Sequence, residues 1–169
     1  MPDGFAPKQE SWLSQIARQV PGFRGYFERE DRRAADEAQR RALAERLHRS
    51  GAALGGLSQR WLAAGAIDAL PMIDALRRRL DVLINRLGNA PRGYSAFFDR
   101  QQIDAARLDA VYQYDSELLW DVELLAKKIE EVASSATATD ATAMFNELTA
   151  AVAAVEERLA GRESVLRDL

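Results

Sequence analysis

Two short loops carry residue types that could bind an anion. Arg24-Gly25-Tyr26 and Arg92-Gly93-Tyr94 each follow a proline and precede a long helical pattern. A glycine-containing turn at a helix N-terminus presents unpaired backbone N–H groups and the positive end of the helix dipole. Arg24 and Arg92 could add bidentate contacts to a phosphate or carboxylate. The structural alternative is that the glycines permit the turn while Tyr26 and Tyr94 plug the end of a bundle.

Asp115 is the one charged member of an otherwise apolar helical seam. That seam comprises Leu108, Val111, Asp115, Leu118, Val122, Leu125, Ile129 and Val132. A buried carboxylate is costly unless it is paired. We therefore expect an arginine or tyrosine partner, from a loop or from the charged segment 28–49. The functional alternative is a metal ligand or general base, with Tyr112, Tyr114, Glu117 and Asp121 nearby in sequence.

Glu45 and His48 have the Glu-x-x-His spacing that carboxylate-bridged di-iron bundles use twice. The chain has a single histidine, so a second such motif is excluded. An incomplete mononuclear site with Asp115 and Glu117 is the remaining metal hypothesis. Glu45 and His48 lie among charges that we expect to face solvent, so no metal or other cofactor is predicted.

Other catalytic and binding classes find little support. There is no cysteine, no Ser-His-Asp set, no glycine-rich phosphate loop and no zinc-ligand spacing. A net charge of −3 disfavours a nucleic-acid binder, and Arg77-Arg78-Arg79 is interpreted as a solvated helix face. No stretch approaches the ~20 apolar residues that span a bilayer. The chain is expected to be cytoplasmic.

Helices must position these residues, because the chain is rich in Ala, Leu, Arg and Glu. Apolar periodicity predicts helices at 8–20, 27–64, 68–87, 100–133 and 140–161. Besides the seam that contains Asp115, three of these helices have predicted inward seams, namely Leu43, Leu47, Ser50, Leu54, Leu57, Trp61 and Ala64 in the second, Met72, Ile73, Leu76, Leu80, Leu83, Ile84 and Leu87 in the third, and Met144, Leu148, Val152, Val155 and Leu159 in the last. Gly55-Gly56 is expected to interrupt the second helix, Asp68 and Asp140 to cap the third and last, and Gly161 to end the last. The prediction is one all-α domain over residues 1–169, an up-down bundle of about four long helices plus a short N-terminal amphipathic helix.

Loop, long helix, Asp cap, shorter helix and glycine recur in the same order. This raises an internal duplication with units 21–88 and 91–160, in which the loops and long helices align at an offset of 68 and the shorter helices at 72. Heptad-like seams align by construction, so convergence on ordinary helix punctuation stays open.

The two loops also carry a resemblance. Pro21-Gly22-Phe23-Arg24-Gly25-Tyr26 resembles a Pro-Gly-Tyr-Arg-Gly-Tyr signature of certain uncharacterised bacterial helical proteins. The segment from Gly93 to Asp99 resembles their Gly-Tyr-Ser-Gly-Phe-Phe-Asp signature, with Ala96 where a glycine is usual. The resemblance implies a small bacterial helical protein, and it implies no activity.

These observations lead to three functional hypotheses. The first is a non-enzymatic scaffold or protein-interaction module that uses segment 28–49 or self-association. The second is an anion or small-molecule binder using the paired loops, and the third a carboxylate metal site. The helix at 8–20 has an apolar face that could dock on the bundle or, alternatively, rest on a membrane surface.

Overall fold

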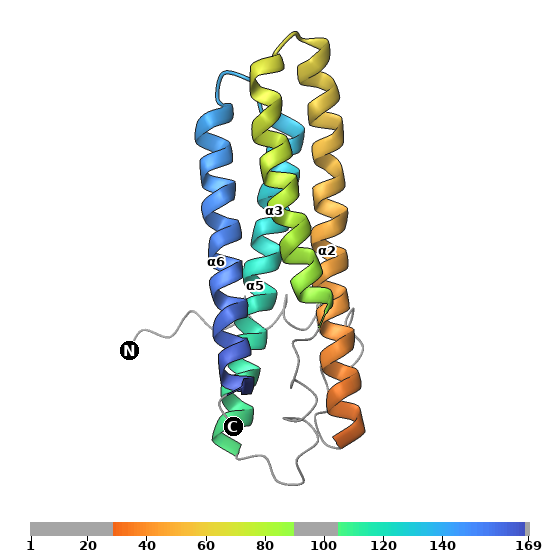
Figure 1. Cartoon of the computed structure of the whole chain (residues 1–169), viewed down its shortest axis with the longest axis vertical. Coiled ribbons are helices and arrows are strands. Elements are labelled where there is room, and N and C mark those ends of the chain that lie inside the picture. Colours follow the sequence, from red (N-terminus) through yellow and green to blue (C-terminus); the bar gives the residue numbers. More distant parts are fainter. Residues whose placement is uncertain (1–28, 90–104, 168–169) are drawn as a thin grey trace, which may run out of the picture.

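The computed structural model describes residues 29–89 and 105–167, and these ranges form a helical bundle (Figure 1). Its four long helices within those ranges are α2 (Arg29–Ala63), α3 (Leu70–Gly88), α5 (Ala105–Ser135) and α6 (Ala141–Arg167). A single 3₁₀ turn, Ile67–Ala69, precedes α3. The predicted all-α bundle is confirmed. The predicted helix at 8–20 and both Arg-Gly-Tyr loops lie outside the described residues.

The helices run alternately up and down, and each packs on two neighbours. α2 contacts α3 and α5, and α6 contacts α5 and α3, so the two hairpins lie side by side (Figure 1). Like-directed helices are therefore neighbours. The same separation of 77 residues joins Arg46 of α2 to Glu123 of α5 and Arg79 of α3 to Glu156 of α6. This register differs from the sequence offsets of 68 and 72, and the internal duplication stays a prediction.

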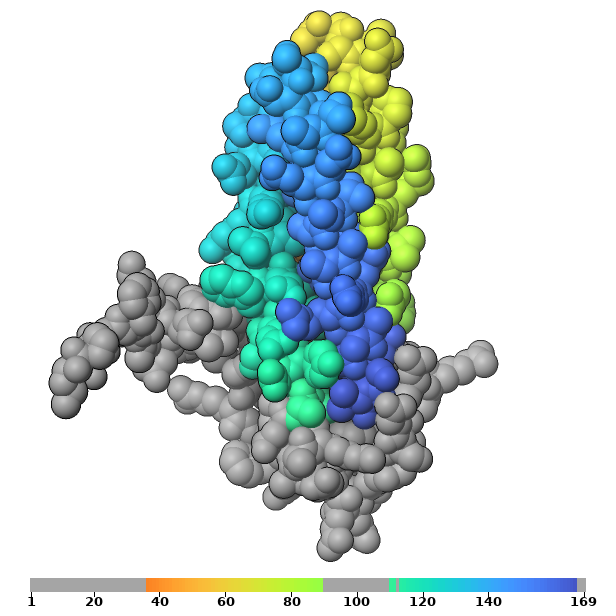
Figure 2. Space-filling model, turned by 90° about the vertical axis from the view of Figure 1, so that its left-hand side faces the viewer, coloured from red at the N-terminus to blue at the C-terminus, as the bar shows by residue number. Residues whose placement is uncertain are grey.

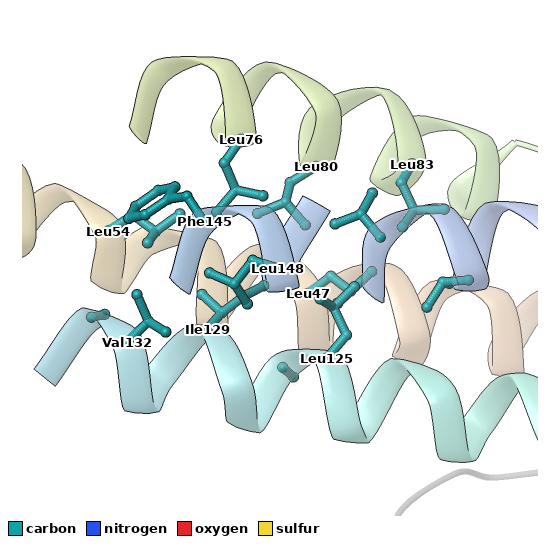
Figure 3. Close-up of a cluster of buried hydrophobic side chains, with 14 of the residues drawn as sticks. Leu47, Leu54, Leu76, Leu80, Leu83, Leu125, Ile129, Val132, Phe145 and Leu148 are labelled. Atoms are coloured by element: carbon teal, nitrogen blue, oxygen red, sulfur yellow. The ribbon is translucent and has the colours of Figure 1, made fainter. Parts of the chain in front are cut away.

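The predicted seams form one apolar core between the four helices (Figure 3). The α5 seam is buried from Val111 to Val132, and α3 buries Ile73, Leu76, Leu80, Leu83 and Leu87. At about 25 cal/mol per Å² of apolar surface removed from water, such layers supply most of the force that holds the helices together. The seam spacing alternates between three and four residues, which keeps one stripe of each helix inward.

Backbone groups at the hairpin ends are satisfied by specific contacts. Gly65 has φ +75°, and the N–H groups of Gly65 and Ala66 donate to the carbonyls of Leu62 and Trp61 at 3.0 and 2.9 Å. This glycine-terminated motif ends α2, because a left-handed residue is needed there. At the C-terminal end of α5, Trp61 Nε1 donates to the Ala136 carbonyl at 3.3 Å. The Trp61 ring also packs on Phe145, with ring centroids 5.8 Å apart.

Three predictions about helix ends, breaks and caps are wrong. α6 continues through Gly161 to Arg167, and Gly161 instead leaves room for the Tyr114 ring: a Cβ added there would lie 2.9 Å from Tyr114 Cε1. α2 runs unbroken through Gly55 and Gly56, since flanking helical residues and packing outweigh the low propensity of two glycines. Asp68 lies in the 3₁₀ turn, and the N-cap of α3 is Ala69 with no side-chain cap.

Candidate functional site

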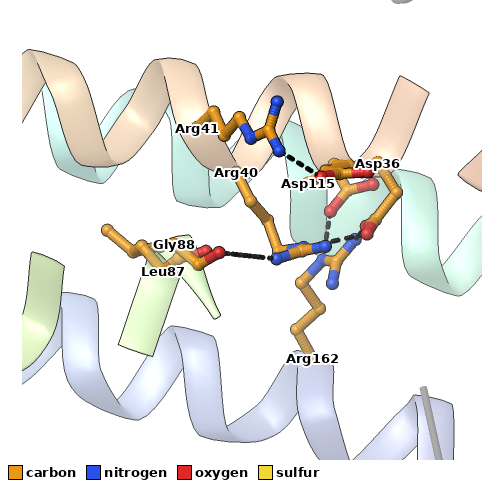
Figure 4. Close-up of polar contacts among 8 residues, drawn as sticks. Asp36, Arg40, Arg41, Leu87, Gly88, Asp115 and Arg162 are labelled. Carbon is orange, nitrogen blue, oxygen red and sulfur yellow. Dashed lines mark hydrogen bonds and ion pairs between the residues drawn. The ribbon is translucent and has the colours of Figure 1, made fainter. Parts of the chain in front are cut away.

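Four charged side chains lie inside the lower end of the bundle, where a core layer would normally be apolar (Figure 4). They are Asp36 and Arg40 of α2, Asp115 of α5 and Arg162 of α6, and we call them the polar layer. Their exposed fractions are 2% for Asp36, 8% for Arg40, 2% for Asp115 and 2% for Arg162. Two carboxylates and two guanidiniums leave no net charge in this layer.

The two aspartates of the polar layer are joined by one arginine. Arg162 Nη2 donates to Asp36 Oδ1 at 2.5 Å, and Arg162 Nε donates to Asp115 Oδ1. Arg162 therefore connects α6 to α2 across the bundle and to its neighbour α5. Charge-assisted bonds of this kind are shorter and stronger than neutral ones. The cost of burying each charge is offset because the opposite charge is in contact.

Arg40 ties the polar layer to the end of α3. Its Nε donates to Asp36 Oδ2 at 2.9 Å, while Nη1 lies 3.5 and 3.3 Å from the carbonyl oxygens of Leu87 and Gly88. The last carbonyls of a helix lack intrahelical partners and carry the negative end of its dipole, so a guanidinium is favourable there. All four helices thus contribute to one polar contact set.

The structure pairs Asp115 with an arginine, as expected, but the arginine comes from an unexpected element. The predicted partner of Asp115 was a residue of a loop or of segment 28–49, whereas Arg162 lies in the last helix. Segment 28–49 does contribute, because Asp36 and Arg40 belong to it. Both residues are buried.

A sequence signal for the missed residues exists in the seams. Continuing the α2 seam of Leu43 and Leu47 backwards at the same spacing reaches Arg40 and Asp36. Continuing the α6 seam forwards from Leu159 reaches Arg162. A charged residue at such a seam position stays inward when a complementary charge occupies the facing seam.

The remaining candidate residues are not gathered by the described structure. Arg24, Tyr26, Arg92 and Tyr94 lie outside the described residues, so the loop-based ligand site stays a prediction. Glu45 and His48 are exposed on α2, on the outside of the bundle. Over residues 29–89 and 105–167, no three His, Cys, Asp or Glu side chains come close enough to hold a metal ion together.

Ion pairs bridge three of the four neighbouring helix pairs. Arg46 of α2 binds Glu130 and Glu123 of α5, and Arg158 of α6 binds Asp121 of α5. The α3–α6 pair is bridged by Arg79 with Glu156 at 2.7 Å and by Arg86 with Glu163 at 3.0 Å. Figure 2 shows the face on which α6 lies between α5 and α3, the two helices that these α6 side chains reach.

The bridging arginines are held in their charged form. The hydrogen bonds that Arg46 donates to Glu130 and Glu123 raise its pKa above the ordinary value. The bond to Glu156 raises the pKa of Arg79, and the bond to Asp121 raises that of Arg158. A raised pKa on a base adds stability at every pH below the ordinary value. These pairs therefore contribute across the neutral range.

A surface groove runs between α2 and α3. Two adjoining hollows of about 430 and 580 Å³ share His48 and Ile84. The α2 wall of this groove runs from Arg41 to Ala52, and the α3 wall from Asp74 to Gly88. We call it the α2–α3 groove.

No protein-family model, curated protein or solved structure matches this chain. No helix within the described residues contains an apolar stretch long enough to cross a membrane. What the protein does must therefore be inferred from its own residues.

Proposed function

We propose that this chain is a non-enzymatic, cytoplasmic protein-interaction module that binds a partner protein along the α2–α3 groove. The α2 wall of the groove lies in segment 28–49 from Arg41 to His48, and this segment is the one that the sequence hypothesis assigns to partner binding. The observation that carries the proposal is the contrast between this helix pair and the other three. Within the described residues, the α2–α3 pair alone among the four has no ion pair between its helices.

Charged side chains are present at the α2–α3 groove but are not used within the bundle. Arg77 and Arg78 are exposed on its α3 wall, as are Asp74 and Asp81. None of the four has an ion-pair partner among the described residues. These charges surround the apolar lining residues Ala42, Ala44 and Ile84. Unpaired charges around an apolar centre are typical of a surface that recognises another protein, because the charges add specificity and the apolar centre adds affinity.

The buried charges support the non-enzymatic part of the proposal. Asp36, Arg40, Asp115 and Arg162 pair with one another and with the end of α3, and their burial keeps them from bulk substrate. A charge network at core positions is well suited to setting the register of a bundle. The exposed surface therefore carries the proposed function.

Affinity purification of the full chain tests the proposal. The groove variant is Arg77→Glu with Arg78→Glu, which reverses two exposed charges without breaking an ion pair of the described residues. The matched control is Lys127→Glu with Lys128→Glu, which reverses two charges on α5, away from the groove. A specific partner should be recovered by the wild type and the control and reduced at least about tenfold with the groove variant, a loss of about 1.4 kcal/mol.

Two outcomes would overturn the proposal. One is a monomer by light scattering that recovers no specific partner by cross-linking or purification. The other is a partner recovered equally by the groove variant and the control. A concentration-dependent dimer that the groove variant disrupts would identify the partner as a second copy of the chain.

A further inference from the structure

The exposed polar residues along the α2–α3 groove are spaced alike on its two helices. Each helix carries a set of three exposed residues spaced at four and then three positions, and the sets are Arg41, Glu45 and His48 on α2 and Asp74, Arg78 and Asp81 on α3. The α2 set reads base, acid, base, and the α3 set reads acid, base, acid. A surface attracts a partner whose charges match its own in position and are opposite in sign. The α3 set is therefore the complement of the α2 set.

The direction of the helices decides how the two sets meet. Within one copy α2 and α3 are antiparallel, so the two sets run in opposite directions (Figure 1). In a dimer whose two copies are antiparallel, α3 of the second copy runs in the same direction as α2 of the first copy. The equal spacing then allows each member of the α2 set to lie level with its complement in the α3 set of the second copy.

The height of the two sets along the bundle fixes where a two-fold axis must lie. A Cβ added at Gly51 would lie 3.8 Å from Leu80 Cδ1, so these two residues are level with each other. At 1.5 Å per residue, Arg41 then lies about 12 Å to one side of Arg49, and Asp74 lies about 12 Å to the other side. A two-fold axis level with Arg49 therefore brings the α2 set level with the α3 set of the second copy, with the two grooves directly opposite each other.

An exposed apolar side chain lies at the level of this axis. Val82 of α3 is 58% exposed, and it lies within about 2 Å of the level of Arg49. In the antiparallel dimer α3 faces α3 of the second copy, so Val82 lies beside its own counterpart. Ala44 and Ile84 line the hollows on the same face. An apolar centre with charges around it is the usual composition of a specific interface.

We propose that the partner bound at the α2–α3 groove is a second copy of this chain, antiparallel to the first about a two-fold axis near Arg49 and Val82. The contacts between the copies are Arg41 with Asp74, Glu45 with Arg78, and His48 with Asp81. Each contact occurs twice, because a two-fold interface is self-complementary. The inference rests on the proposed function, since it names the partner of the same groove.

The parallel arrangement of two copies lacks these contacts. There α3 of the second copy faces α2 at equal height, which places Asp74 opposite Ser58 and Asp81 opposite Gly51, two residues without charge. In the antiparallel arrangement Asp81 of the second copy also comes within about 2 Å of the level of Arg49, so it balances that charge near the axis. Glu45 pairs with Arg49 inside one copy, but both side chains are exposed and such a pair contributes little.

The size of this face predicts a dimer of modest affinity. Two adjacent helices are about 20 Å wide, and the paired residues extend over about 24 Å of their length. Such a face buries roughly 500 Å² on each copy, which is near the lower limit for a specific interface. A dissociation constant of about 1–100 μM is therefore expected.

Charge exchange between two full-length variants tests the pairing. Arg41→Asp faces Asp74 of the second copy, and Asp74→Arg faces Arg41, so each variant alone should dimerise at least about tenfold more weakly than the wild type in low salt. A mixture of the two variants should dimerise like the wild type, because both contacts of the mixed dimer join opposite charges. The matched control, Lys127→Glu with Lys128→Glu on α5, should dimerise normally. Sedimentation equilibrium from about 5 to 500 μM covers the expected dissociation constant.

Disulfide trapping tests the position of the axis, because the chain has no cysteine of its own. A residue beside a two-fold axis is close to its own counterpart, so Val82→Cys should link two copies under mild oxidation. The matched control is Leu62→Cys, which is 59% exposed against 58% for Val82 but lies about 19 Å from the level of the axis. The Val82→Cys dimer should form at least about tenfold faster than the Leu62→Cys dimer. Equal rates would overturn the proposed axis.

The other results of the charge exchange also overturn the inference. A dimer that neither single variant weakens joins its copies through another face. A mixture that stays as weak as the single variants means that Arg41 and Asp74 do not meet. A chain that is monomeric at every concentration has no second copy as its partner. In that last case the proposed function still holds if a different protein is recovered and is lost with Arg77→Glu and Arg78→Glu, so the two proposals fail separately.

Discussion

Replacing Arg162 by methionine probes the polar layer most directly. Methionine keeps most of the volume and removes the guanidinium that contacts both Asp36 and Asp115. All three side chains are 2% exposed, so water does not replace the lost partner easily. Removing one member of a buried ion pair costs about 3–5 kcal/mol. For a chain of this length, that corresponds to a fall in Tm of about 6–20 °C.

The measurement is urea unfolding followed by far-UV circular dichroism, with a matched control on the same helix. Arg158→Met removes the ion pairs of Arg158 to Asp121 and Glu117 at the surface of α6. Because such pairs are partly solvated, this control should cost only about 0–1 kcal/mol. The difference, at least about threefold between two arginines only four residues apart, would arise from burial. Equal costs for Arg162→Met and Arg158→Met would refute the reasoning.

A double variant tests the same contacts. Adding Asp115→Leu should restore most of the lost stability, since Asp36 keeps Arg40 as a partner at 2.9 Å. A double variant that is less stable than Arg162→Met would show that Asp115 has a separate stabilising role.

Three smaller predictions concern the glycines and one surface bridge. Gly161→Ala should lower the free energy of unfolding by about 1–2 kcal/mol, because the added Cβ overpacks on Tyr114. In a Tyr114→Ala background the clash is gone, and the same substitution should raise the free energy of unfolding by about 1 kcal/mol. Thermal unfolding measures both effects. Gly65→Ala should lower the free energy of unfolding by about 1–2 kcal/mol, because Gly65 has a positive φ that alanine rarely adopts. Gly88 has open space around it, so Gly88→Ala should change the free energy of unfolding by under about 0.5 kcal/mol. Arg46→Gln should cost about 1 kcal/mol in low salt and less in 1 M NaCl, where the Arg46 bridges are screened; a salt-independent cost would contradict a Coulombic origin.

Within the described residues, local sequence was sufficient to predict the four long helices and their core stripes. The observed α3 and α5 seams match the predicted ones from Leu76 to Leu87 and from Val111 to Val132. The reason is that a helix has 3.6 residues per turn, so the residues of its buried face recur every three or four positions as apolar residues. The same spacing identified Asp115 as a charge on an inward position.

The end of α6 near Gly161 could not be predicted in the same way. Glycine after an apolar run usually marks a helix C-terminus. Whether it does so here depends on Tyr114, which lies 47 residues earlier in the chain and packs where a Cβ would be. Only the packing of α5 against α6 brings the two together.

The amino-acid sequence by itself determined that this protein is a bundle of helices, which faces of those helices are apolar, and that Asp115 needs a partner. The tertiary structure alone decided that Arg162 is that partner, that Asp36 and Arg40 are buried with it, and that the α2–α3 pair keeps an open groove. The physical reason is that spacing along one helix reports burial but not the identity of the neighbour. Charges on facing seams become compatible with the core only when several helices place them in contact.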